Sequence, residues 1–273
     1  RYVIAVSAFS LFQGFLAGTQ VVQGVYRVHG SFAHSNPLGI TMVTLGPLLL
    51  VSTVQETQRR ALFALAYLAA ALGIVYTRSR ASLALLGLGT GAVLGFMFLR
   101  GLVLGRIQVV RRVAILVVCG GLAVTPLAIK IADGVIKRFK EAPASSKESR
   151  DRANEAAKQM LRDAPLTGKG LNHYVHYLDY GYGLDIEEGD RTIVHHVYWL
   201  TGAELGWPGL LLLVAIVLTW LLVGVQALLT AQDDWVAHVA LGLTVGYGLC
   251  HLQHLYEWAM RKPQVLFQLT TMA

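Results

Sequence analysis

The stretch 208-PGLLLLVAIVLTWLLVGVQ-226 decides the fold class, because it contains no charged side chain over its whole length. A helix of about 20 mostly apolar residues crosses the hydrocarbon core of a bilayer, so this stretch predicts a transmembrane helix. The composition of the chain agrees, since 55% of its residues are hydrophobic and only 14% are charged. Soluble domains carry about 25% charged residues. The sequence therefore favours a membrane protein over a soluble α/β enzyme.

Apolar runs of similar length recur along the chain. We expect membrane spans at 2–22, 38–54, 61–77, 81–99, 113–131, 198–225 and 235–257. Gly and Pro inside these runs do not argue against helix, because membrane helices tolerate both. The predicted fold is an all-α, polytopic transmembrane helical bundle. The apolar segment 264–273 looks like the start of another span, which suggests a fragment of a longer protein.

The arginines of two short loops indicate the orientation of the spans. Loop 55–60 carries Arg59 and Arg60, and loop 100–112 carries four more arginines. Short basic loops prefer the cytoplasm. Alternating the spans from these two loops places the following segments on the outer side: 23–37, 78–80, 132–197 and 258–263.

The loop 132–197 contains 11 of the 16 acidic residues, which supports the outer assignment. The predicted organisation is therefore membrane helices in 1–131, an extracytoplasmic loop over 132–197, and further membrane helices in 198–273. Within the loop, 150-RDRANEAAKQMLRDAP-165 has apolar residues at helical spacing opposite a charged face, namely Ala153, Ala156, Ala157, Met160, Leu161 and Ala164. We expect an amphipathic helix against the outer membrane surface or the bundle, ended by Pro165 and the glycines that follow it.

Several arginines fall on the predicted outer side. The preference of basic residues for cytoplasmic loops does not explain arginines in this position. Arg78 and Arg80 lie in the tight turn 76-YTRSRAS-82. They can anchor helix ends at the headgroups, or bind an anionic ligand such as a diphosphate, whose oxygens a planar guanidinium matches. Arg150 and Arg152 begin the loop helix, where solvation and salt bridges with nearby acidic residues are the alternative.

The pair His195–His196 lies at the mouth of the span 198–225. A neutral imidazole near the headgroup plane is a natural proton acceptor at physiological pH. The alternative is an interfacial anchor alongside Tyr198 and Trp199. The pair has no HExxH or similar zinc signature, so we expect no metal. His251, His254 and Glu257 are spaced to share one helix face, and we expect them to line a polar cavity or pack between helices.

Other classes of partner receive no support. Topology accounts for the net charge of +7, and no basic run interleaved with aromatic residues is present, so we expect no nucleic acid. No P-loop, dinucleotide fingerprint, GxSxG or CxxC motif occurs, and we expect no cofactor.

Four short stretches carry a resemblance to a known family. They are R-x2-G-S-F-x2-S-N-P-L from Arg27, TRSRASLALL from 77, PLTGKGLNHY from 165 and HHVYWLTGAELGWPG from 195. In this order, spacing and common outer face they resemble the bacterial O-antigen ligase/polymerase superfamily of membrane glycosyltransferases. Two positions depart from the family pattern: His196 stands where asparagine is usual, and Asn154 where tryptophan is common.

The resemblance implies roles for individual residues. Counting back from Glu204 and Gly206 places the family histidine on His195, and counting back from Pro165 places the family arginine on Arg150. The implied catalytic residues are His195, Arg150 and Arg80. The implied substrate-binding residues are Arg27, Asn36, Arg78, Arg152, His196, Tyr198, Glu204, Gly168 and Gly170.

The resemblance also implies an activity, namely metal-independent, inverting transfer of a glycan from undecaprenyl diphosphate to an acceptor hydroxyl. The implied location is the bacterial inner membrane, among its lipids, with the active site facing the periplasm. The acceptor is lipid A-core for a ligase, a growing polysaccharide for a polymerase, or a protein for an oligosaccharyltransferase. A transporter or flippase for a lipid-linked saccharide is a rival of another class, as is a scaffold protein. A transporter predicts polar residues through the membrane depth, whereas here they cluster at one surface.

Overall fold

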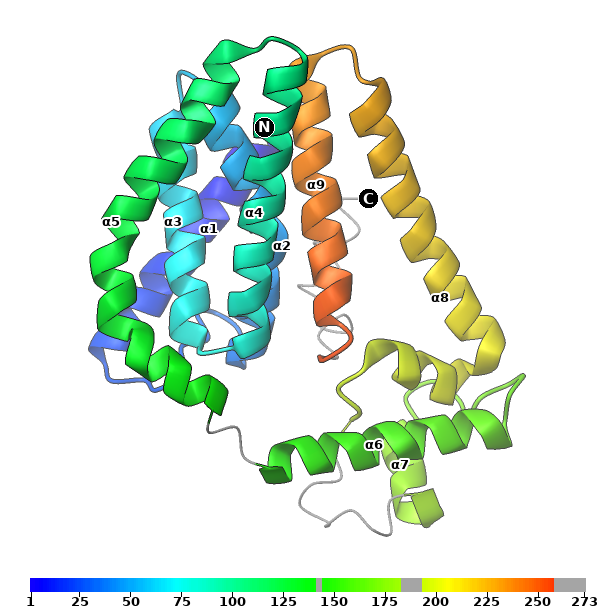
Figure 1. Ribbon diagram of the computed structural model, residues 1–273. Helices are drawn as coiled ribbons and strands as arrows, with labels where there is room; N and C mark the ends of the chain where they lie inside the picture. The colour runs from blue at the N-terminus through cyan, green and yellow to red at the C-terminus, as the bar shows by residue number, and fades with distance from the viewer. Residues whose placement is uncertain (141–143, 183–192, 258–273) are drawn as a thin grey trace. The chain divides into compact units, whose positions relative to one another are not determined.

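The computed structural model describes residues 1–140, 144–182 and 193–257, without the side chains of 124, 127, 128, 130–147 and 180. The described residues form helices and no strand, as predicted (Figure 1). The elements are α1 (Tyr2–Val22), α2 (Ser35–Gln55), α3 (Arg60–Thr77), α4 (Arg80–Val103), α5 (Ile107–Lys140), α6 (Ala144–Asp163), α7 (Tyr174–Tyr177), the π-helix η1 (Leu178–Tyr182), α8 (Val197–Thr230) and α9 (Asp234–Gln253).

Six of these helices are long and apolar enough to cross a membrane, namely α1, α2, α3, α4, α8 and α9. They correspond to six of the predicted spans, and the fold class is confirmed. The remaining predicted span, 113–131, lies inside α5, which continues to Lys140 and so takes up the start of the predicted loop. The predicted segments 258–263 and 264–273 lie outside the described residues.

The chain divides into two compact units. Unit 1 contains Arg1–Lys140 and Leu221–Cys250, and the described part of unit 2 contains 144–182, 193–220 and 251–257.

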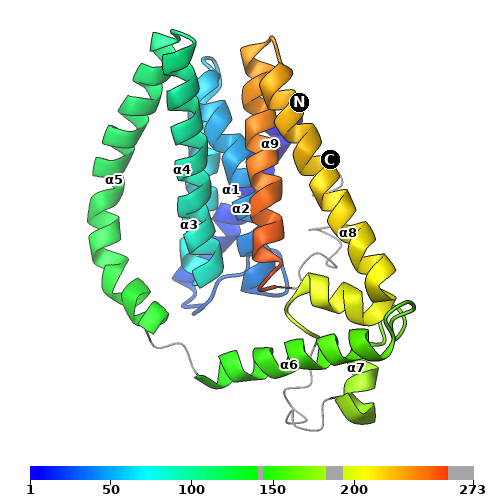
Figure 2. The same ribbon diagram turned by 45° about the vertical axis from the view of Figure 1, so that its right-hand side comes forward.

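Helix α2 lies in the middle of unit 1, packed against α1, α3 and α4 (Figure 2), and it meets α5 near Val54. Every residue from Pro37 to Val54 is buried. The sequence explains this position, because the helix has almost no polar side chain longer than threonine over that range. Helix α9 also approaches α2 closely, since a Cβ on Gly242 would lie 2.8 Å from the Cα of Leu48.

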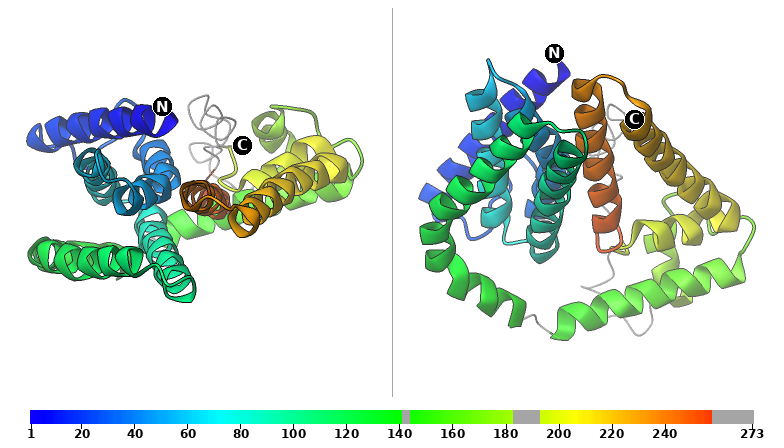
Figure 3. Two further views of the ribbon diagram at one scale, coloured as in Figure 1. Left: turned by 90° about the horizontal axis from the view of Figure 1, so that it is seen from above. Right: turned by 45° about the horizontal axis from the view of Figure 1, so that its top comes forward.

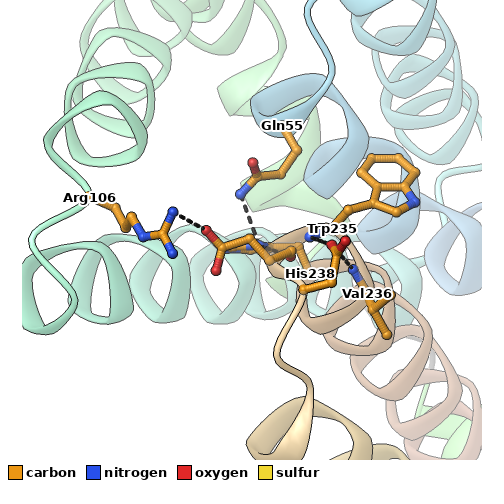
Figure 4. Close-up of polar contacts among 7 residues, drawn as sticks. Gln55, Arg106, Trp235, Val236 and His238 are labelled. Carbon is orange, nitrogen blue, oxygen red and sulfur yellow. Dashed lines mark hydrogen bonds and ion pairs between the residues drawn. The ribbon is translucent and has the colours of Figure 1, made fainter.

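Polar contacts join several helix ends of unit 1 at the loop 55–60. Arg106, between α4 and α5, pairs with Asp234 at 2.9 Å, and Gln55 contacts the ring of His238 at 2.9 Å (Figure 4). Arg112 of α5 donates to the carbonyl oxygen of Val54 at 3.2 Å. Figure 3 shows the α4–α5 and α8–α9 connections at this same end. The structure therefore brings together the two basic loops that the sequence assigns to one side.

Unit 2 has its own apolar cluster, built around α6. The buried members are Ala153, Ala156, Ala157, Met160, Tyr174, Leu178, Val194, Leu200 and Ala203. The apolar face predicted for the loop helix is therefore buried against protein, except that Ala164 is only partly covered. The helix spans Ala144–Asp163, so it begins before the quoted stretch and ends two residues before Pro165.

Candidate active site

In unit 1, the turn 77–80 places Arg78 and Arg80 at the ends of two helices. Arg78 has a φ of 54° and closes α3 in the left-handed conformation. Its guanidinium lies 4.1 Å from the centre of the Tyr26 ring, a cation–π distance. Ser79 caps α4 by accepting from the backbone N–H of Ser82 at 3.4 Å. Arg80 is consequently the first residue of α4, where the turn holds its backbone.

Arg27 and Asn36 are joined to this turn by hydrogen bonds. The Nε of Arg27 donates to the carbonyl oxygen of Thr77 at 3.1 Å, and its Nη2 donates to Oδ1 of Asn36 at 2.8 Å. The last carbonyls of a helix lack intrahelical partners, and a guanidinium satisfies one of them here. The structure thus brings together the predicted residues Arg27 and Asn36 at the turn that carries Arg78 and Arg80.

In unit 2, the turn 165–170 packs directly onto the backbone of α8. Lys169 N donates to the carbonyl oxygen of Ala203 at 2.8 Å, and Gly170 N donates to that of Glu204 at 2.9 Å. Gly168 has a φ of 63°, and a Cβ there would lie 2.2 Å from the carbonyl carbon of Glu204. Only glycine permits this backbone conformation and this approach together.

Gly206 is the matching glycine on α8. Its φ of 68° and ψ of −170° break the helix, so the span predicted as one helix over 198–225 has an interruption near its start. A Cβ on Gly206 would lie 2.6 Å from the carbonyl oxygen of Pro165, while Trp207 N donates to that oxygen at 2.7 Å. The sequence stretches that begin at 165 and at 195 therefore form the two sides of one backbone contact.

Glu204 and Tyr174 connect this contact to α6. Glu204 is buried, and its Oε1 accepts from the backbone N–H of Tyr174 at 3.4 Å. The Tyr174 hydroxyl donates to the carbonyl oxygen of Ala153 at 2.8 Å. The observed contacts of Glu204 position the loop, and the predicted contact of Glu204 with substrate stays a prediction.

His195 contacts a carboxylate that the sequence did not assign to it. Its Nδ1 lies 3.3 Å from Oε1 of Glu257, whose side chain is mostly buried. The prediction that Glu257 shares a helix face with His251 and His254 was wrong, because α9 ends at Gln253 and residues 254–256 form a turn. The turn frees Glu257 from the helical register, and no spacing rule in the sequence indicates a contact across 62 residues.

His196 has a different environment from its neighbour. Its Nδ1 accepts from the backbone N–H of Trp199 at 3.3 Å, which is the geometry of a helix N-cap at the start of α8. Burial lowers the pKa of His196, and the positive charge of Lys158 adds to this effect. Tyr198 belongs to the same turn, and its hydroxyl contacts Nδ1 of His251 at 3.1 Å. His196 is therefore a neutral capping group near neutral pH.

The two arginines of α6 differ in their contacts. Arg152 pairs with Glu148 at 2.6 Å, so it forms a salt bridge, although the sequence pointed to Asp151 and Glu155 as the acidic residues. Arg150 is partly exposed, and no hydrogen bond or ion pair joins it to the described residues. Arg80 belongs to unit 1, whereas Arg150 and His195 belong to unit 2, and their meeting in one pocket stays a prediction. Among the described residues, no three His, Cys, Asp or Glu side chains gather as metal ligands.

Comparison with known proteins gives one result that bears on these residues. No curated protein matches the chain. The model of a protein family described as O-antigen ligase matches residues 65–214, more than half of the chain. The match includes the stretches that begin at 77, 165 and 195, and therefore the turn 77–80 and the contact between the 165–170 turn and α8. The chain belongs to the O-antigen ligase family.

Proposed function

We propose that this protein transfers a glycan from undecaprenyl diphosphate to an acceptor hydroxyl at the periplasmic face of the bacterial inner membrane. Family membership supports the class of reaction, and six apolar helices support a multi-pass membrane protein. The observation that carries the mechanism is the contact between His195 Nδ1 and Glu257 Oε1.

His195 is the proposed general base. A carboxylate on Nδ1 favours the tautomer in which Nδ1 carries the hydrogen, which leaves Nε2 with its lone pair. Nε2 then takes the proton of the acceptor hydroxyl while that oxygen attacks the anomeric carbon. The anomeric C–O bond to the diphosphate breaks, and in-line attack inverts the anomeric centre. Glu257 acts as a positioning residue, and it stabilises the imidazolium that forms.

Arg150 and Arg80 are the proposed ligands of the departing diphosphate. Guanidinium groups stabilise the charge that develops on phosphate oxygens as the bond breaks. Arg150 has no described partner that would compete for it, and the capped turn 77–80 holds the backbone of Arg80. Arg27 and Asn36 support this turn, and Arg78 adds positive charge beside Arg80, whereas Glu148 offsets the charge of Arg152 beside Arg150.

The test uses a strain that lacks the gene, complemented with wild type or with single variants His195→Ala, Arg150→Ala or Arg80→Ala. Each variant should reach the membrane and lose at least about 100-fold of the glycan transfer. Arg162→Ala is the matched control, because Arg162 lies on α6 and pairs only with exposed Glu155 among the described residues. Wild-type activity in all three variants would exclude the proposal.

The same strain distinguishes the acceptors by its glycans. Uncapped lipid A-core would indicate a ligase, single-repeat decoration a polymerase, and an unglycosylated protein an oligosaccharyltransferase. Loss of the glycans with the lipid-linked saccharide trapped on the inner leaflet would favour a flippase, whereas a transferase loss should leave the donor on the outer leaflet.

A further inference from the structure

Three arginines gather at the end of unit 1 away from the turn 77–80. Arg60 is the first residue of α3, whose last residue is Thr77, so Arg60 lies at the opposite end of that helix. Arg111 and Arg112 lie in the first turns of α5. We call Arg60, Arg111 and Arg112 the arginine cluster.

The end of α2 draws two of these guanidinium groups together. Arg112 Nη1 donates to the carbonyl oxygens of Val54 at 3.2 Å and of Gln55 at 3.4 Å. Arg60 Nε donates to the next carbonyl oxygen, that of Glu56, at 3.1 Å. Each guanidinium has five N–H donors, so both keep donors for a further ligand.

The carboxylates near the arginine cluster have other hydrogen-bond or ion-pair partners. Oε1 of Glu56 accepts from the backbone N–H groups of Thr57 and Gln58. Asp233 accepts from two backbone N–H groups at the start of α9, and Asp234 pairs with Arg106. Among the described residues, no ion pair involves any member of the arginine cluster. Burial lowers the pKa of Arg112, and the charges of Arg60 and Arg111 lower it further.

The face of α5 that carries Arg111 is otherwise apolar and exposed. Ile107 and Ile115 lie four residues before and after Arg111, on the same side of the helix, and are 69% and 53% exposed. Val118 and Leu122 continue this exposed stripe, which extends away from the arginine cluster. A cation at the end of an apolar stripe matches a molecule with a charged head and a hydrocarbon tail.

We propose that the arginine cluster binds the phosphate of an anionic phospholipid, whose acyl chains lie along Ile115, Val118 and Leu122. The preference for basic inner loops requires only an excess of positive charge, spread over a loop. That preference does not explain why guanidinium groups from two helices lie at the same end of α2 with no carboxylate paired to them among the described residues. Basic groups between membrane helices are a known way of holding such headgroups. The bound phosphate would join α2, α3 and α5 at the end of unit 1 opposite to the turn 77–80.

The test measures lipid binding to the purified protein in neutral detergent by native mass spectrometry. Phosphatidylglycerol should bind at least about tenfold more tightly than phosphatidylcholine, and Arg111→Gln should weaken it about fivefold, the effect of one charge near a membrane surface. The double variant Arg60→Gln/Arg111→Gln should weaken it further. Arg59→Gln is the matched control, because Arg59 is exposed beside Arg60 and no described hydrogen bond or ion pair involves its side chain. It should change binding less than twofold.

Three outcomes would overturn the proposal. Equal losses in Arg59→Gln and Arg111→Gln would indicate diffuse attraction rather than a site. Equal binding of the two lipids would exclude recognition of the anionic head. Thermal stabilisation by inorganic phosphate as strong as that by phosphatidylglycerol would assign the site to a free anion. Arg111 is exposed and has no described partner, so its variant should unfold at the wild-type temperature without lipid, which separates lipid binding from folding.

Discussion

His195 Nδ1 lies 3.3 Å from Oε1 of Glu257, a residue 62 positions further along the chain. We expect Glu257→Gln to lower kcat for glycan transfer at least about tenfold with little change in KM, because an amide fixes the tautomer of His195 less well and does not stabilise the imidazolium. His195→Ala should lose more, about 100-fold to 10,000-fold. Initial rates with donor and acceptor varied separately measure both parameters.

The control for this pair is Glu155→Gln, because Glu155 is an exposed carboxylate that pairs with Lys158 and Arg162. Equal kcat values for Glu257→Gln and Glu155→Gln would show that the carboxylate does not position the base.

Replacing Gly168 by alanine should destabilise unit 2 strongly. The added Cβ would lie 2.2 Å from the carbonyl carbon of Glu204, in a backbone conformation that already disfavours a side chain. We expect a loss above about 3 kcal/mol, seen as a lower unfolding temperature and poor recovery from membranes. Gly105→Ala measures the cost of the left-handed backbone conformation alone. Gly105 has a similar φ of 65°, and no atom lies within 4 Å of the position that a Cβ would take. This substitution should cost only about 1 kcal/mol, and equal losses in both variants would exclude the steric explanation.

His196→Asn should keep the N-cap of α8, since asparagine is among the best capping residues, whereas His196→Ala should cost about 1 kcal/mol. Thermal unfolding near neutral pH measures both changes. If the alanine variant unfolds at the wild-type temperature, the contact between His196 Nδ1 and Trp199 N does not cap the helix.

The pH dependence of stability gives a separate test of His196. Its pKa in the folded protein lies below the ordinary value of about 6.5, so between these two values the unfolded chain binds more protons. The stability of wild type should therefore fall as the pH drops below about 6.5, and protonation would also remove the acceptor at Nδ1. His196→Asn should remove part of this fall, and identical pH profiles for wild type and variant would contradict the assignment.

Tyr174→Phe should lower stability by about 1–3 kcal/mol, because it leaves the buried carbonyl oxygen of Ala153 without its 2.8 Å donor. Tyr177→Phe is the control in the same apolar cluster, and no described hydrogen bond involves its hydroxyl. Chemical unfolding followed by tryptophan fluorescence compares the two variants, and equal losses would show that the hydroxyl of Tyr174 contributes nothing.

Periodicity and hydrophobicity predicted much of the fold because they act locally. A run such as 208–226 must be helical in a membrane, where each backbone polar group needs a partner within its own segment. The apolar face of α6 was likewise predictable from the 3.6-residue period, and five of its six predicted members are buried. Helix ends were less predictable: α9 stops at Gln253 and α8 breaks at Gly206, because contacts with other segments decide where a helix ends.

The sequence by itself determined the membrane-spanning, all-helical class and the order of the family motifs, since both depend on residue types at short spacing. Only the tertiary structure decided which groups meet. The carboxylate of Glu257 contacts His195, and the backbone N–H of Trp199 donates to Nδ1 of His196. The backbone of α8 packs against Gly168. These contacts join residues through turns and a helix break whose directions depend on packing, and residue spacing carries no information about them.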